Sequence, residues 1–250
     1  MNANDIASEI RKGIAAGEYA YGSRLPSVRD LAERHGVSQQ TAAAAYAVLA
    51  ALGMVSTERG SGTTVTAGRS ASAHLGSFSP PNLAVASAWT PSAGGEGSEK
   101  TTLVEQTSAP ASMESWGIQE GSQVVERTRI RSVDGTPCQH KLTVLPYEIA
   151  ARAPEGHEGA PPMLAPVGSA PVRPPEGVRV ADWLGWDVDH TVARITAEPM
   201  TSAAAAALGM PEGTPGFRIV NVTKNSDGGT VYVTVTTTPL HHEITLDIIG

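Results

Sequence analysis

The sequence predicts an α+β protein of two domains, and three observations carry this prediction. Residues 1–68 hold three capped helical stretches, followed by a glycine-rich turn between β-branched residues. Residues 101–250 hold alternating runs on either side of the Asp-Gly at 134–135 and of the Asp-Gly-Gly at 227–229, a pattern typical of antiparallel hairpins. The Ser/Ala/Gly/Pro stretch between them, residues 69–100, is interpreted as a linker.

The first domain begins with three helices, which we expect over residues 6–16, 28–35 and 39–52. Short polar side chains can cap their N-termini: Asp5, Ser27 and Ser38. Apolar residues recur at helical spacing on their inward faces: Ile6, Ile10 and Ile14, then Val28, Leu31 and Ala32, then Ala42, Ala45, Leu49 and Leu52. Glycine ends the second helix at Gly36 and the third at Gly53. Two helices joined by a short turn that contains glycine form a helix-turn-helix.

Two short strands follow the helices, around the stretch RGSG at residues 59–62. The glycines let backbone amides approach a phosphate or the minor groove, and Arg59 supplies positive charge. We interpret this hairpin as a wing, so the first domain is predicted to bind double-stranded DNA. The chain's net charge of −7 does not oppose this interpretation, because residues 1–68 hold equal numbers of acidic and basic side chains.

The segment SRLPSVRDLAERHGVSQQTAAAAYAVLAALGMVSTERGSGTTV, residues 23–65, resembles the winged helix-turn-helix of the GntR family of bacterial transcription regulators. The second half, with QEGSQVVERTRIRSVDGTP and ALGMPEGTPGFRIVNVTKNSDGGTVYV, resembles the UTRA ligand-binding domain of the HutC branch, a fold similar to chorismate lyase. The resemblance implies a homodimer held by the C-terminal domains, an inverted-repeat operator and a small effector that releases the DNA. We therefore expect a repressor.

The residues expected to contact DNA lie on the helix-turn-helix and the wing. Many members of the family have arginine directly after the turn serine and again four residues later, where this chain has Gln39 and Ala43. Glutamine pairs with adenine and an alanine methyl packs on thymine, so we expect an operator that differs from the usual family sequence. Gln40 is the third base-facing candidate. The candidates for phosphate contact are Arg24, Ser27, Arg29, Ser38, Thr41, Arg59, Gly60, Gly62 and Thr63.

The second domain carries a row of arginines, which strand alternation places on one face: Arg127, Arg129 and Arg131. Related domains also place arginines near the ligand, but Lys141 stands where they often have an acidic residue. The candidate effector-binding residues are Arg129, Arg131, Thr102, Thr143 and Tyr232. Fixed arginine charge favours a carboxylate or phosphate ligand. The alternative is that the row is only the solvated face of a sheet.

Other residues argue against metal, cofactor and catalytic sites. Cys138, the single cysteine, cannot form an intrachain disulfide, and Cys138 and His140 have no residue to orient them as nucleophile and base. On a strand, His241 and His242 would point to opposite faces, so no shared metal is expected. With no apolar run of 18 residues and no signal sequence, we expect a cytoplasmic protein without membrane association.

Two further segments have recognisable character. The Ala-rich stretch TSAAAAALGM is predicted to be a short helix, with Thr201 or Ser202 as its N-cap. Residues 153–177 contain seven prolines, so they cannot form a helix or a central strand, and we interpret them as a loose excursion. Two other functions stay open: an enzyme that acts on a small organic acid through the chorismate-lyase-like domain, and an autoregulatory repressor without an effector.

Overall fold

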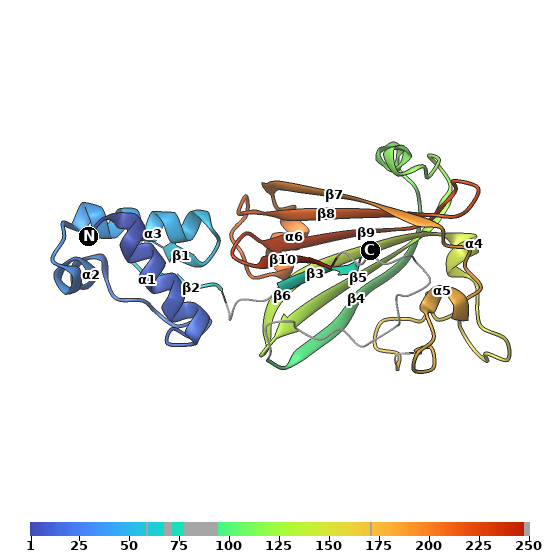
Figure 1. Cartoon of the computed structure of the whole chain (residues 1–250), viewed down its shortest axis with the longest axis horizontal. Helices are drawn as coiled ribbons and strands as arrows, with labels where there is room; N and C mark the ends of the chain where they lie inside the picture. Colours follow the sequence, from blue (N-terminus) through green and yellow to red (C-terminus); the bar gives the residue numbers. More distant parts are fainter. Residues whose placement is uncertain (59, 68–71, 78–94, 171, 248–250) are drawn as a thin grey trace.

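The computed structural model of the chain describes residues 1–58, 60–67, 72–77, 95–170 and 172–247. Figure 1 shows a small, mostly helical domain that includes the N-terminus and a larger domain built on a twisted sheet. The predicted α+β class, with a winged helix-turn-helix joined to an antiparallel-sheet domain, is confirmed.

The first domain contains α1 (Ala3–Ala16), α2 (Val28–His35), α3 (Gln39–Ala51) and a hairpin of β1 (Val55–Glu58) and β2 (Gly62–Val65). Ser27 and Ser38 cap α2 and α3 as predicted. Helix α1 begins three residues earlier than predicted, because Asn2 rather than Asp5 is its N-cap. The Asn2 side chain accepts from the amide of Asp5, and the Asp5 carboxylate accepts from the amide of Asn2.

The core of this domain is aliphatic and small, as the composition predicts. Ile6, Ile14, Leu31 and Leu49 are each at most 1% exposed. The sequence pattern missed Tyr46, which is 3% exposed and whose hydroxyl donates to the carbonyl of Pro26 at 2.6 Å. Burial raises the pKa of the Tyr46 phenol to about 12, so it remains a donor at physiological pH.

The second domain is built on one six-stranded antiparallel sheet with strand order β4-β5-β6-β9-β8-β7. In chain order its strands are β4 (Gly97–Ser108), β5 (Gln123–Val133), β6 (Thr136–Pro146), β7 (His190–Pro199), β8 (Pro215–Lys224) and β9 (Thr230–Pro239). Both predicted hairpins are present. At the β5–β6 turn Asp134 has φ 49° and Gly135 has φ 78°, the left-handed conformations that a two-residue hairpin turn requires.

Short elements cover both faces of this sheet. On one face, the 3-10 helix η2 (Ala111–Trp116) packs its Met113 against valines of the central strands: Val124, Val144, Val220, Val222 and Val233. On the other face, α4 (Tyr147–Ala150) and α5 (Val180–Trp183) pack with Trp186 against Val125 and Leu145. Helix α6 (Ser202–Ala207) forms where it was predicted, with Thr201 as its N-cap.

The segment predicted to be a linker, residues 69–100, contains regular structure. Residues 72–77 form β3 (Ser72–Ser77), which pairs in parallel with β10 (Glu243–Asp247), and residues 97–100 are the first of β4. The partner of β3 lies about 170 residues away in the sequence, so the local Ser/Ala/Gly composition carries no sign of this pairing.

The prediction for the proline-rich segment is half correct. Its described residues form no helix or strand, as the prolines require. The segment is nevertheless packed rather than loose: Pro162 is buried, and Met163 and Leu164 pack against the cluster that contains Trp186. Proline prevents regular hydrogen bonding, but it does not prevent burial of the side chains around it.

Candidate functional site

The first turn of α3 presents an uncharged polar surface. The Ser38 hydroxyl accepts from the amide of Thr41 at 3.1 Å and lies 2.9 Å from the Thr41 hydroxyl, so these two side chains fix the helix start. Gln39, Gln40 and Ala43 are exposed. No residue of α3 carries a charge. This surface can therefore approach DNA bases without a carboxylate facing the phosphates.

The chain before α2 lies alongside the wing. Ser23 accepts from the amide of Val65 at 2.9 Å, and Leu25 donates to the carbonyl of Thr63 at 2.9 Å. Arg24, which lies between Ser23 and Leu25, is exposed, and its backbone forms an isolated antiparallel β-bridge with Thr64. The fold thus brings Arg24 to the wing, although some 40 residues of sequence separate them. Arg29 is exposed on α2, where Ser27 serves as the cap and exchanges hydrogen bonds with Asp30.

The wing turn has the backbone that its glycines permit. Gly60 and Gly62 have φ 87° and 86° and are exposed. Arg59, the predicted charge of the wing, lies outside the described residues. Thr63 differs from the prediction for its side chain: it is 5% exposed and its hydroxyl lies 3.2 Å from that of Thr57. It therefore packs inside the wing instead of presenting a surface hydroxyl.

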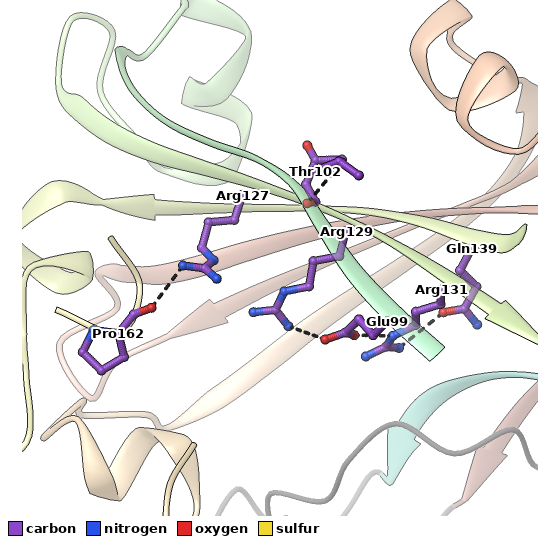
Figure 2. Close-up of polar contacts among 8 residues, drawn as sticks. Glu99, Thr102, Arg127, Arg129, Arg131, Gln139 and Pro162 are labelled. Atoms are coloured by element: carbon purple, nitrogen blue, oxygen red, sulfur yellow. Dashed lines mark hydrogen bonds and ion pairs between the residues drawn. The ribbon is translucent and has the colours of Figure 1, made fainter. Parts of the chain in front are cut away.

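The arginine row of the second domain lies on one face of β5. The register sets Arg127 opposite Thr143, Arg129 opposite Lys141, and Arg131 opposite Gln139. Figure 2 shows the three arginine side chains extending to the same side, Arg127 toward Pro162 and the other two toward Glu99. A carboxylate from the neighbouring strand joins two of them: Glu99 Oε1 lies 3.2 Å from Arg129 Nη1, and Glu99 Oε2 lies 2.7 Å from Arg131 Nε.

Arg127 has a different role from its neighbours. It is 7% exposed, and its Nη1 donates to the carbonyls of Pro162 and Met163 at 3.1 and 2.5 Å. Burial, with a smaller contribution from Arg129, lowers the pKa of the guanidinium to about 10. Arg127 therefore holds the proline-rich segment against the sheet. The sequence pattern could not distinguish it from Arg129 and Arg131, because alternation gives only the face.

Lys141 adds a fourth cation to this face. Burial, together with repulsion from Arg131 and Arg129, lowers the pKa of its ammonium to about 7. The same cations lower the pKa of the Glu99 carboxyl. Burial alone would raise this pKa, but the charges of Arg129 and Arg131 outweigh the effect of burial. On this face the described strands thus place Arg129, Arg131 and Lys141 near one carboxylate, while Arg127 is turned toward the proline-rich segment.

The other predicted effector residues are not all gathered at the arginine pair. Thr143 lies between Arg127 and Thr234 in the cross-strand register. Tyr232 packs in the apolar cluster, with its ring centroid 5.7 Å from that of Trp186. Thr102 sits at a bulge of β4, and its hydroxyl donates to the carbonyl of Thr128 at 3.4 Å. The arginines and Lys141 are therefore the charged centre of this face.

A cavity of about 510 Å³ lies elsewhere in the domain. Its lining includes Tyr147, Glu148, Arg152, Asp187 and Asn225, and none of the predicted effector residues. Its one lining arginine, Arg152, donates to the carbonyl of Gly185 at 2.6 Å. The cavity thus has room for a ligand but lacks the concentration of positive charge found on the arginine face.

Cys138 and the neighbours His241 and His242 are the other reactive or metal-binding side chain types that the sequence singled out. Burial raises the pKa of the Cys138 thiol to about 12, and its Sγ donates to the carbonyl of Arg131 at 3.3 Å. His241 and His242 lie in a turn, not in a strand as supposed, and their ring centroids are 4.2 Å apart. The described residues contain no group of three side chains suited to a metal. Within them, no helix is long and apolar enough to cross a membrane.

Comparison with known proteins agrees with this geometry. Residues 2–65 match the family of bacterial regulatory proteins called gntR. Over 246 residues the chain is 28% identical to an uncharacterized HTH-type transcriptional regulator of Streptomyces coelicolor, covering 91% of this chain and 84% of that protein. Over 60 residues it is 43% identical to the pyridoxine biosynthesis regulator PdxR of Corynebacterium glutamicum, covering 24% of this chain and 13% of PdxR.

A solved structure supports the fold of the whole chain. The crystal structure of a protein assigned to the GntR-family transcriptional regulators aligns with a TM-score of 0.50 at 22% identity, over 99% of this chain and 96% of the other. Both aligned relatives are named as transcriptional regulators, which favours a regulator over the enzyme that the sequence left open. Residues 2–65 are thus a gntR-type DNA-binding domain, in a chain that is similar over most of its length to an HTH-type transcriptional regulator.

Proposed function

We propose that the protein is a repressor that binds an inverted-repeat operator as a dimer and leaves it when a small anion binds the second domain. One observation carries the DNA half of this proposal. The first turn of α3 is exposed and uncharged, and Ser38 and Thr41 fix its geometry. A recognition helix inserts this turn into the major groove.

The side chains of that turn favour particular bases. A glutamine amide can donate to adenine N7 and accept from adenine N6, so Gln39 and Gln40 fit A·T pairs. Ala43, one helical turn later, is short enough to let the helix lie close to a thymine methyl. Arg24 and Arg29, both exposed, supply charge for the flanking phosphates.

Binding selection on randomised duplex DNA, followed by genomic footprinting, tests this half of the proposal. We expect an inverted repeat whose half-sites are separated by about one helical turn, with A·T pairs opposite α3. Selected sequences without a shared half-site, and binding no tighter than to bulk DNA, would reject sequence-specific repression.

The charge on the arginine face supports an anionic effector. Arg129, Arg131 and Lys141 lie there near one carboxylate, and burial with repulsion from the two arginines lowers the pKa of Lys141 to about 7. Arginine binds carboxylates and phosphates through paired hydrogen bonds, so a ligand with two or more acidic oxygens suits Arg129 and Arg131. Replacing either arginine by glutamine is expected to preserve operator binding and to prevent release. If the effector still releases both variants from operator DNA as it releases the wild type, the effector does not bind at the arginine face.

The edge strand β7 supports a dimer. It pairs only with β8, and it exposes apolar side chains on both faces, with Val192 and Ile195 at 43% and 42% exposure. Monomeric proteins protect such edges, and a two-fold related copy of β7 would continue the sheet.

Sedimentation of the full chain is expected to give a dimer that Ile195→Arg dissociates. The matched change Leu103→Arg, on the opposite edge strand β4, is expected to leave the dimer intact. A dimer that survives Ile195→Arg would put the interface elsewhere.

A further inference from the structure

The two arginines best placed to bind an effector anion already hold a carboxylate. Glu99 gives one oxygen to Arg129 at 3.2 Å and the other to Arg131 at 2.7 Å, and Figure 2 shows it between them. Its side chain is 28% exposed, so solvent and solutes can reach the ion pairs. A dissolved anion with two oxygens would make the same two contacts.

Glu99 belongs to a weakly held part of the sheet. Strand β4 is an edge strand, and its first residues pair on one side only, Gly97 with Val133 and Glu99 with Arg131. Residues 97–100 are exposed, and a bulge after Thr101 interrupts the ladder. Segments with few buried contacts open at low free-energy cost. The ion pairs of Glu99 therefore add side-chain contacts to the backbone pairing that holds this end of β4 on the sheet.

The position of this strand end along the chain gives its release a consequence. β4 is the first strand of the six-stranded sheet, and residues 95–97 lead the chain into it, after β3 has paired separately with β10. The amide of Glu96 donates to Asp134 Oδ1 at 2.8 Å, which makes the strand entry depend on the β5–β6 turn. A change in how β4 begins thus changes how the chain enters the six-stranded sheet.

We propose that Glu99 is a built-in competitor of the effector: an incoming anion displaces its carboxylate from Arg129 and Arg131 and releases the first residues of β4. This inference rests on the proposed effector role of the arginine face. It specifies the ligand as a small anion whose two oxygens span both guanidiniums, as the Glu99 carboxylate does. Repression would persist while Glu99 occupies the arginines and end when another anion replaces it.

Inorganic sulfate is a suitable probe, because it carries the required oxygens and keeps its charge near neutral pH. We would titrate sulfate calorimetrically into the full-length wild type, Glu99→Gln and Glu105→Gln. Glu105 is the matched control, a second carboxylate of β4 that pairs opposite Glu126. Because Glu99→Gln removes a partly exposed competitor, sulfate should bind this variant roughly five- to thirtyfold more tightly. The affinity of Glu105→Gln should equal that of the wild type.

Hydrogen exchange provides a second readout that needs no knowledge of the natural effector. Exchange of amides 97–101 should be faster in Glu99→Gln than in Glu105→Gln, and sulfate should accelerate it in the wild type. Equal or weaker sulfate binding by Glu99→Gln, or no sulfate binding by any variant, would overturn the inference.

Operator binding, measured separately, distinguishes this inference from the proposed function. If Glu99→Gln gains affinity for sulfate but no anion releases DNA, the competitor exists and the effector-release proposal fails. If an anion releases DNA equally from the wild type and Glu99→Gln, release stands and the competitor role of Glu99 is wrong.

Discussion

The first turn of α3 and the arginine row of β5 are both surfaces suited to a partner, yet the fold prepares them in opposite ways. On α3 the exposed side chains of Gln39 and Gln40 make no hydrogen bond to another described residue, and only the capping side chains are engaged. On β5 the arginines already have partners within the chain: backbone carbonyls for Arg127 and Glu99 for the other two.

This difference fits two different tasks. A surface without internal partners can bind whenever DNA is present, because no contact within the protein must first be broken. A surface with internal partners binds only what competes with them, and the displaced group can carry the change elsewhere in the molecule. The α3 surface thus needs no internal contact to be broken before it binds, whereas the proposed effector surface does.

The largest effect is expected from Arg127, the buried arginine whose Nη1 donates to two backbone carbonyls. Arg127→Leu leaves two carbonyls without their donor and should destabilise the second domain by about 2–4 kcal/mol. Thermal and denaturant unfolding measure this loss. Arg218→Leu is the matched control: its ion pair with Glu198, at 3.5 Å, is partly exposed and should contribute less than about 1 kcal/mol. Equal losses in the two variants would mean that Arg127 does not clamp the proline-rich segment.

The next effect concerns the open surface. Gln39→Arg should change the preferred base opposite this residue from adenine to guanine, with a discrimination of about 1–3 kcal/mol, because arginine pairs with guanine O6 and N7. Binding selection with the wild type and the variant measures it.

Arg24→Ala supplies the contrast for that measurement. Loss of a phosphate contact should weaken binding to all sequences about equally and reduce the dependence on salt. If Gln39→Arg leaves the base preference unchanged, a different residue reads that position.

The two domains also differ in how much of their structure the sequence could predict. The DNA-binding domain is encoded locally: Ser27, Ser38, Gly36 and the wing glycines act within a few residues of the structure they specify, so their elements were placed correctly. Only the start of α1 was wrong, because both Asn2 and Asp5 can cap and the reciprocal box decides between them.

The second domain depends on contacts that are distant in sequence. Alternation correctly gave one face to the three arginines, but it could not reveal that Arg127 meets Pro162, 35 residues away, or that Glu99 meets Arg131. Glu99 lay in the segment interpreted as a linker, where composition hid the start of a strand. The pairing of β3 with β10 was missed for the same reason.

The smallest expected effect concerns the pH dependence of anion binding and tests whether Lys141 belongs to the sensor. In the free protein, burial and the neighbouring arginines lower the pKa of its ammonium to about 7, so Lys141 loses its charge as the pH rises above neutrality. A bound anion favours the charged form and raises this pKa, so binding above pH 7 must take up a proton.

Sulfate affinity should therefore fall by about tenfold between pH 6.5 and 8.5. Calorimetry in buffers of different ionisation enthalpy should detect the proton uptake. Lys141→Met should lose most of this dependence, whereas Lys100→Met, at an exposed lysine of β4, should retain it. An equally steep dependence in Lys141→Met would assign the titration to another group and remove Lys141 from the sensor.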